Sequence, residues 1–270
     1  MSIDPLFDCS DQVVAITGAA GQLGAGYAAA FAARGAAVAI LDVAPSAASR
    51  SLEDRHPGHV RFFACDVTSK SSLGDALAAI QAFRGTPTTL INNAAIDSPP
   101  SAPLEENGPF ETYPEESWDR VLDVNLKGVF LSCQTIGAAM AQAGRGSIVN
   151  VASIYGLVSP DQSIYDYRRQ RGEVFFKPVA YSASKSGIYN LSRYLAAYWA
   201  RQGVRVNSLT IAGVFAGQEQ AFLDAYTARI PVGRMAQPGE YDGAVLFLAS
   251  PASASMTGAN LVMDGGWTAI

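Results

Sequence analysis

Seven short apolar runs, rich in β-branched residues, alternate along this chain with longer segments of helical character. Each run is apolar almost throughout, which is typical of strands in a parallel sheet buried on both faces. The alternation predicts one α/β domain over residues 1–270, with a doubly wound, seven-stranded parallel sheet and helices on both faces. The expected strands are 12–17, 37–41, 60–64, 88–91, 147–152, 204–209 and 260–263, and the main expected helices are one ending at 34, then 69–84, 117–143, 180–202 and 239–249.

The composition narrows the class of protein. A net charge of −5 and a pI near 5.0 argue against a nucleic-acid binder, which needs a basic patch. No apolar run is long enough to span a membrane, and the N-terminus lacks the basic start of a signal peptide. Three scattered cysteines suggest buried thiols, so we expect a cytoplasmic protein. His56 and His59 stand in a polar turn without cysteine partners, and we expect no metal site.

A glycine-rich loop follows the first expected strand and leads into the first expected helix. Gly18, Gly21 and Gly24 stand three residues apart in this loop. Gly18 suits a tight turn, Gly21 lets the backbone approach a pyrophosphate, and Gly24 allows close contact between helix and strand. Glycines also make ordinary turns, but the strand–loop–helix context indicates a dinucleotide site. Such sites lie at the carboxyl ends of the strands.

Residues after the next three strands extend this candidate site. Asp42 stands about 20 residues beyond the glycines, where a carboxylate can accept hydrogen bonds from a ribose. It would repel a 2′-phosphate, and no Lys or Arg lies nearby in sequence, so NAD is favoured over NADP as cofactor. Asp66 could accept from the adenine amino group, although either aspartate could instead cap a helix or turn. The small Ala94 and Ala95 after Asn93 leave room for a flat ligand.

Tyr181 and Lys185 indicate proton chemistry. They are four residues apart at the start of an expected helix and so share one face. A nearby ammonium favours the phenolate and lowers the pKa of the phenol. A phenol tuned in this way can move the proton that accompanies hydride transfer at carbon. The alternative is an ordinary pair on the helix surface.

Two further polar residues fit the same chemistry. Ser153 follows the fifth expected strand, where its hydroxyl could hold the substrate oxygen or simply cap a helix. Asn125 lies inside an expected helix with Gly128 nearby, and asparagine is a poor residue for a helix interior. This pattern suggests a local break that holds a water, or alternatively an asparagine facing solvent.

Together these residues resemble the single-domain short-chain dehydrogenases/reductases over nearly the whole chain, which implies a Rossmann-type fold. The resemblance implies that Tyr181 is the general acid/base and that Lys185 lowers its pKa and binds the nicotinamide ribose. It also implies that Ser153 orients the substrate oxygen and that Asn125 holds a water in a proton relay. The matching positions are the 17–24 loop, Asp42, Asp66, Asn92-Asn93-Ala94, Asn125, Ser153, Tyr181-x-x-x-Lys185 and Met263-Asp264-Gly265-Gly266.

The same resemblance implies a homo-oligomer, a tetramer or dimer, with the helices of Asn125 and Tyr181 packing between subunits. Parts of the 93–97 and 156–161 segments are similar to a bacterial branch tied to surface-carbohydrate and flagellin glycosylation. Ala95 replaces a usual glycine, and Ile211-Ala212-Gly213 replaces the usual Pro-Gly segment. The further cofactor contacts expected from the resemblance are Gln22, Leu23, Gly24, Val67 and Val214.

Two long segments, about 96–117 and 156–180, should rise at the substrate edge of the sheet. Arg168 and Arg171 could bind an anionic group of a sugar or sugar phosphate, or could form a solvated face or subunit contact. Ile154 and Tyr155 are also candidate substrate contacts. We expect a NAD-dependent oxidoreductase that interconverts a secondary alcohol and a ketone, with a sugar or polyol-like substrate. The alternatives are a hydrophobic or aromatic alcohol, bound by the aromatic residues of these segments, and an inactive NAD-binding regulator.

Overall fold

The strand order explains where the site must lie. The computed structural model describes residues 4–97 and 106–270, and its seven strands are all parallel in the order β3-β2-β1-β4-β5-β6-β7. The order reverses between β1 and β4, which is where a doubly wound sheet opens a crevice for a ligand. Every expected strand is present with ends within two residues: β1 Val13–Thr17, β2 Ala37–Asp42, β3 Val60–Ala64, β4 Thr89–Asn92, β5 Gly146–Ser153, β6 Val204–Ile211 and β7 Asn260–Met263.

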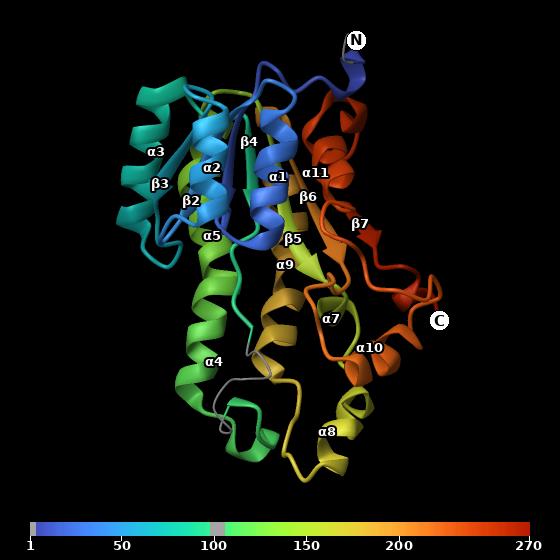
Figure 1. Ribbon diagram of the computed structural model, residues 1–270. Coiled ribbons are helices and arrows are strands. Elements are labelled where there is room, and N and C mark those ends of the chain that lie inside the picture. Colours follow the sequence, from blue (N-terminus) through green and yellow to red (C-terminus); the bar gives the residue numbers. More distant parts are fainter. Residues whose placement is uncertain (1–3, 98–105) are drawn as a thin grey trace.

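Helices cover both faces of the sheet, as expected. One face packs against α1 (Gln22–Ala32), α2 (Ala47–Arg55) and α11 (Asp242–Ala249), which lie in front of the strands in Figure 1. The other face packs against α3 (Lys70–Arg84), α5 (Gly128–Ser132), α6 (Ala138–Gln142) and α9 (Val179–Trp199). The helix α4 (Glu115–Leu122) packs on α9 and extends this layer beyond the carboxyl edge of the sheet.

Some helices differ from the sequence expectation. The expected 117–143 helix runs from α4 to α6 and contains two π-helical turns, Asp123–Lys127 and Cys133–Gly137. The helix expected from 239 begins at Asp242, since Gly239 has a φ of 91° and cannot be helical. We did not expect α2, which has only one large buried apolar side chain, Leu52, and so carries little hydrophobic periodicity.

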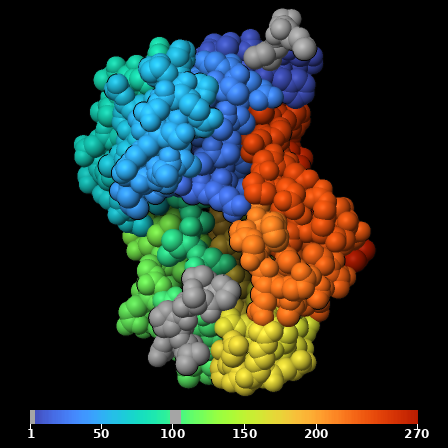
Figure 2. All heavy atoms as spheres, in the orientation of Figure 1, coloured from blue at the N-terminus to red at the C-terminus, as the bar shows by residue number. Residues whose placement is uncertain are grey.

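A third apolar cluster lies beyond the carboxyl ends of the strands. Two short helices, α7 (Ile154–Leu157) and α10 (Gln220–Thr227), contribute buried residues to it, as does the 3-10 turn Gln162–Tyr165. A further short helix, α8 (Asp166–Gln170), follows that turn. The 156–180 segment is therefore partly helical and is not simply a loop. Figure 2 shows this segment and α10 together at the end of the molecule farthest from the N-terminus. The buried aromatic residues of the cluster are Tyr155, Tyr165, Phe175, Tyr226 and Trp267.

Candidate active site

The three loop glycines have different physical reasons to be glycine. Gly18 has a φ of 65°, and a Cβ there would lie 2.6 Å from Ala94 Cα. A Cβ on Gly24 would lie 2.4 Å from the Gly18 carbonyl oxygen, so Gly24 lets α1 approach the loop. A Cβ on Gly21 would meet only the Gly18 oxygen, at 3.4 Å, and would otherwise enter the open space above the loop. Gly18 and Gly24 thus serve packing, whereas Gly21 leaves space for a ligand.

A hydroxyl and an amide join β1 to β4 at the reversal point. The backbone N–H groups of Asn93 and Ala94 both donate to Thr17 Oγ1 at 3.1 Å. The Asn93 side chain donates to the carbonyl oxygens of Thr17 at 3.2 Å and Gly18 at 3.1 Å. The role of the Thr17 hydroxyl was not part of the sequence prediction. Its signal is a threonine at the end of a strand, directly before the glycine loop.

A cavity of about 480 Å³ opens over these two loops. Its walls combine backbone amides, two aspartates and small side chains, and these are the groups that an elongated dinucleotide needs. Four other predicted cofactor contacts do not line this cavity: Gly24, Tyr181, Lys185 and Val214. The predicted cofactor contacts that do line it are Gly18, Gln22, Leu23, Asp42, Asp66, Val67, Asn93, Ala94 and Ala95.

The two aspartates also shape the backbone around the cavity. Asp42 accepts from the Ala20 N–H of the glycine loop at 3.0 Å and from the Val43 N–H at 2.8 Å, through different oxygens. Asp66 Oδ1 accepts from the N–H and hydroxyl of Thr68, which forms a turn before α3. Neither caps a helix, because Ser46 and Ser69 are the N-caps of α2 and α3.

Ser153, Tyr181 and Lys185 meet at the carboxyl end of β5. Ser153 is the last residue of β5, and its hydroxyl accepts from the Tyr155 N–H at 3.2 Å. The same hydroxyl is near enough to the Tyr181 phenol to influence the pKa of that group. The capping interpretation of Ser153 is confirmed, and its role in holding the substrate oxygen stays a prediction. Lys185 is 3% exposed, donates to the Val151 carbonyl at 2.9 Å, and holds its Nζ 5.8 Å from the centre of the Tyr181 ring.

The electrostatics of this group differ from the sequence expectation. Burial, with a contribution from the Asp97 carboxylate, holds the pKa of Tyr181 above its ordinary value, and the nearby Ser153 hydroxyl only partly offsets this. Burial also lowers the pKa of Lys185 to about 8. The expected lowering of the Tyr181 pKa is thus wrong for the chain by itself. The cause is burial, which is nearly complete for Lys185 and partial for Tyr181.

Asn125 has a clear structural role. It is fully buried in a π-helical turn, so the solvent-facing alternative is wrong. Its amide clamps the backbone of Ile96, accepting from the N–H at 2.8 Å and donating to the carbonyl at 2.9 Å. It also donates to Ser184 Oγ at 3.2 Å, and Ser184 donates to the Tyr181 carbonyl at 2.7 Å. The helix is continuous here, and the water relay through Asn125 stays a prediction.

Two supporting residues were missed by the sequence prediction. The Tyr189 hydroxyl donates to the Ser153 carbonyl at 2.8 Å and also bonds to Thr210 Oγ1 at 2.8 Å, which fixes the end of β5. A Cβ on Gly156 would lie 2.8 Å from the Lys185 backbone, so this glycine lets α7 pack against α9. Tyr189 lies one turn beyond Lys185 on α9, and this spacing is the only signal in the sequence.

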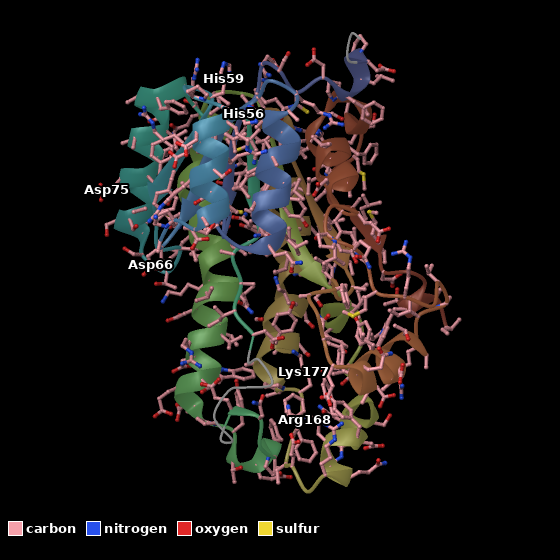
Figure 3. All side chains as sticks on the ribbon, viewed as in Figure 1. His56, His59, Asp66, Asp75, Arg168 and Lys177 are labelled. Carbon is pink, nitrogen blue, oxygen red and sulfur yellow. The ribbon has the colours of Figure 1, made fainter. Side chains whose placement is uncertain are left out.

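The candidate substrate residues divide into two groups. Arg168 pairs with Glu173 and stacks on Phe175, with 4.5 Å between its guanidinium carbon and the ring centre, and Arg171 pairs with Glu219. Figure 3 shows Arg168 in the lower part of the molecule, in the same region as Lys177. Both guanidinium groups therefore already have a carboxylate, and substrate binding by them stays a prediction.

The aromatic residues of the 156–180 segment mainly pack against one another. Ile154 and Tyr155 belong to the buried third cluster next to Ser153, and Tyr165 contacts Phe175 with 4.5 Å between ring centres. Phe176 instead lines a separate cavity of about 430 Å³.

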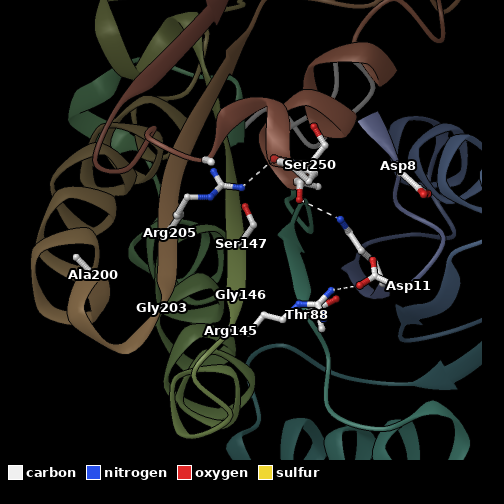
Figure 4. A pocket seen from close by; sticks show the side chains of 14 residues that line it. Asp8, Asp11, Thr88, Arg145, Gly146, Ser147, Ala200, Gly203, Arg205 and Ser250 are labelled. Atoms are coloured by element: carbon white, nitrogen blue, oxygen red, sulfur yellow. Dashed lines mark hydrogen bonds and ion pairs between the residues drawn. The ribbon is translucent and has the colours of Figure 1, made fainter. Parts of the chain in front are cut away.

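Another cavity of about 430 Å³ lies at the opposite, amino edge of the sheet (Figure 4). Arg145 pairs there with Asp11, and Arg205 donates to the carbonyls of Leu248 and Met256. No residue expected to bind cofactor or substrate lines it. The residues expected to bind cofactor and substrate therefore lie at the carboxyl edge.

The described part of the chain contains no helix that is both long and apolar enough to cross a membrane.

Comparison with known proteins agrees with this geometry. A family model described as enoyl-(acyl carrier protein) reductase matches residues 18–268. The chain is 38% identical over 277 residues to the D-threitol dehydrogenase of Mycolicibacterium smegmatis, with 99% of this chain and 97% of that protein covered. The narrower resemblance to a glycosylation branch stays a prediction.

Solved structures give the same fold. A short-chain dehydrogenase from Leptospira borgpetersenii with bound NAD+ is 31% identical, with a TM-score of 0.85 and 99% of this chain and 97% of that chain covered. A gluconate 5-dehydrogenase from Burkholderia cenocepacia in complex with NADP and tartrate is 27% identical, with a TM-score of 0.84 and 98% of both chains covered. The chain therefore belongs to the short-chain dehydrogenase/reductase family of oxidoreductases, which bind nicotinamide cofactors, and it acts on CH–OH groups.

Proposed function

We propose that this protein is a NAD-dependent dehydrogenase that oxidises one secondary alcohol of a neutral polyol to a ketone. The observation that carries the reaction is the grouping of Ser153, Tyr181 and Lys185 at the carboxyl end of β5. Ser153 would hold the carbinol oxygen, and Tyr181 would accept its proton as the carbonyl forms. A nicotinamide bound in the cavity beside these residues would supply the hydride acceptor. Lys185, protonated below about pH 8, would favour the phenolate.

The charge pattern of the 156–180 segment supports a neutral substrate. Every Lys and Arg of this segment pairs with a carboxylate: Arg168 with Glu173, Arg169 with Asp166, Arg171 with Glu219 and Lys177 with Asp97. An anionic substrate would have to compete with these internal partners, whereas hydroxyl groups can bind beside them. The likeness to a D-threitol dehydrogenase points the same way. We therefore favour a polyol over a sugar phosphate.

The choice of NAD rests on Asp42. Its two oxygens already hold the glycine loop and Val43, and each retains a lone pair for a ribose hydroxyl. The carboxylate faces the cavity and would repel a 2′-phosphate.

The test follows nicotinamide absorbance with NAD or NADP against polyols, sugar phosphates and apolar secondary alcohols. We expect turnover of polyols with NAD, and a fall in kcat of about 100- to 10,000-fold in Tyr181→Phe. Tyr194→Phe on the same helix is the control, because it removes only the hydroxyl of a tyrosine that is 64% exposed and keeps the ring, so its kcat should match that of wild type. Turnover that survives Tyr181→Phe would overturn the mechanism. A preference for sugar phosphates would overturn the substrate class.

We further propose that the enzyme is a cytoplasmic homo-oligomer, a tetramer or dimer. Exposed aromatic side chains lie on the helices that the family resemblance implicates in subunit contacts. Phe130 on α5 is 46% exposed, and Tyr194 and Tyr198 on α9 stack with 6.0 Å between ring centres. Light scattering after size exclusion should give two or four copies. A monomer at micromolar concentration would contradict this.

A further inference from the structure

An ion pair beside Tyr181 has no part in the reaction described so far. Asp97, five residues after the end of β4, pairs with Lys177, which lies two residues before α9 begins. The Lys177 Nζ lies 5.2 Å from the centre of the Tyr181 ring. The pair therefore connects the two segments expected to bind substrate, next to the proposed acid/base.

Both partners are held by side-chain amides that clamp the backbone. Gln162 accepts from the Lys177 N–H at 2.8 Å and donates to the Lys177 carbonyl at 3.1 Å. Asn125 makes the same two-way contact with Ile96, the neighbour of Asp97. Two separate clamps thus fix the positions from which the carboxylate and the ammonium extend. Such preorganisation is expected of groups that recognise a ligand.

The pair is partly shielded from water but still accessible. The Lys177 side chain is 11% exposed, and that of Asp97 is 36% exposed. The Asp97 carboxylate acts on the site electrostatically, since it contributes to raising the pKa values of Tyr155, Tyr165 and Tyr181. Lys177 also lines the cavity of about 430 Å³ that includes Phe176 and Ser182. The pair therefore stands between the reacting centre and the space beyond it.

We infer that the Asp97–Lys177 pair recognises a hydroxyl group on the carbon next to the reacting carbinol. A hydroxyl both donates and accepts, so it can donate to the carboxylate and accept from the ammonium without breaking the pair. A monohydroxy alcohol leaves this site unused, and an anion would be repelled by Asp97. The inference rests on the proposed polyol function, and it makes these two residues specificity-determining for vicinal diols.

The test uses 2,3-butanediol and 2-butanol, two alcohols that differ by this one hydroxyl. The kcat/KM for each is measured with NAD, on the pH plateau of each variant, because removal of the Asp97 charge also shifts the pKa of Tyr181. We expect wild type to prefer the diol. Asp97→Asn and Lys177→Met should each lower the ratio of diol to monoalcohol kcat/KM by about 10- to 100-fold, as expected when a hydrogen bond to a charged group is lost.

Arg120→Gln is the matched control. It breaks another ion pair of the first segment, in which Arg120 on α4 is 57% exposed and pairs with Glu106, and it should leave the ratio unchanged. An equal loss on both alcohols in Asp97→Asn, or a ratio unchanged within twofold, would overturn the inference while leaving the polyol function intact. Absence of any polyol turnover by wild type would instead overturn the proposed function, and the inference with it.

Discussion

The cofactor and substrate ends of the site are held together in different ways. At the cofactor end, close backbone packing and short hydrogen bonds connect neighbouring loops, as where Gly18 lies against Ala94 and Asn93 bonds to Thr17. At the substrate end, long side chains connect segments far apart in sequence, as in the Arg171–Glu219 pair. The contrast indicates that close backbone contacts restrict which side chains the cofactor end can accept. The substrate end can change its side chains and hence its specificity.

The largest effect is expected from substitutions of the loop glycines at the cofactor end. Gly18→Ala should lower the free energy of unfolding by about 3 kcal/mol, because it places a Cβ at positive φ and against Ala94. Gly21→Ala should change it by less than about 1 kcal/mol and yet weaken NADH binding at least about tenfold, since its Cβ enters the ligand space. Denaturant unfolding measures the free energy of unfolding of each variant, and NADH fluorescence measures its affinity for NADH. Wild-type NADH affinity in Gly21→Ala would refute the assignment of that space.

A second prediction concerns Lys185, where the two ends meet. Its pKa in the folded chain, about 8, is below the ordinary 10.5, so between these pH values the unfolded chain binds more protons and stability rises with pH. Relative to Lys185→Met, the wild-type free energy of unfolding should increase by about 2 kcal/mol from pH 8 to pH 10. Urea unfolding of both proteins across this range checks it. If the free energies of unfolding of wild type and Lys185→Met changed in parallel with pH, the Lys185 ammonium would not be desolvated in the folded chain.

The third prediction sharpens the role of the cofactor end. Asp42→Asn removes the charge that would repel a 2′-phosphate while keeping one acceptor for the backbone. The ratio of kcat/KM with NAD to that with NADP should fall at least about tenfold, or about 1.4 kcal/mol. Asp66→Asn is the control, because it should affect both cofactors equally. An unchanged ratio in Asp42→Asn would place cofactor selection elsewhere.

The smallest effects belong to the substrate end. Arg168 is 19% exposed and stacks on Phe175, so Arg168→Gln should lower the free energy of unfolding by about 1 kcal/mol. Arg171 is 53% exposed, and Arg171→Gln should stay within about 0.5 kcal/mol. Neither should change the KM for a polyol. A large rise in KM for either variant would restore the role in substrate binding that the sequence first suggested for these arginines.

The sequence predicted the grouping of Ser153, Tyr181 and Lys185 better than the contacts around these residues. Tyr181 and Lys185 could be predicted as a pair because one helical turn separates them. Ser153 could be predicted because it ends an apolar strand. The sequence could not predict that the Asn125 amide bonds to the Ile96 backbone, or that the Gln162 amide bonds to the Lys177 backbone. Each contact joins residues that only folding brings together. The raised pKa of Tyr181 was missed for the same reason, since burial is a property of the whole domain.

The sequence by itself determined the seven strands, the parallel sheet and the glycine loop, because periodicity and glycine spacing are local patterns that backbone sterics enforce. Only the tertiary structure decided that Arg168 and Arg171 are already paired and that Asp97 meets Lys177 beside Tyr181. Coulombic partners need only be close in space, and a charge along a chain does not identify the opposite charge that it will meet.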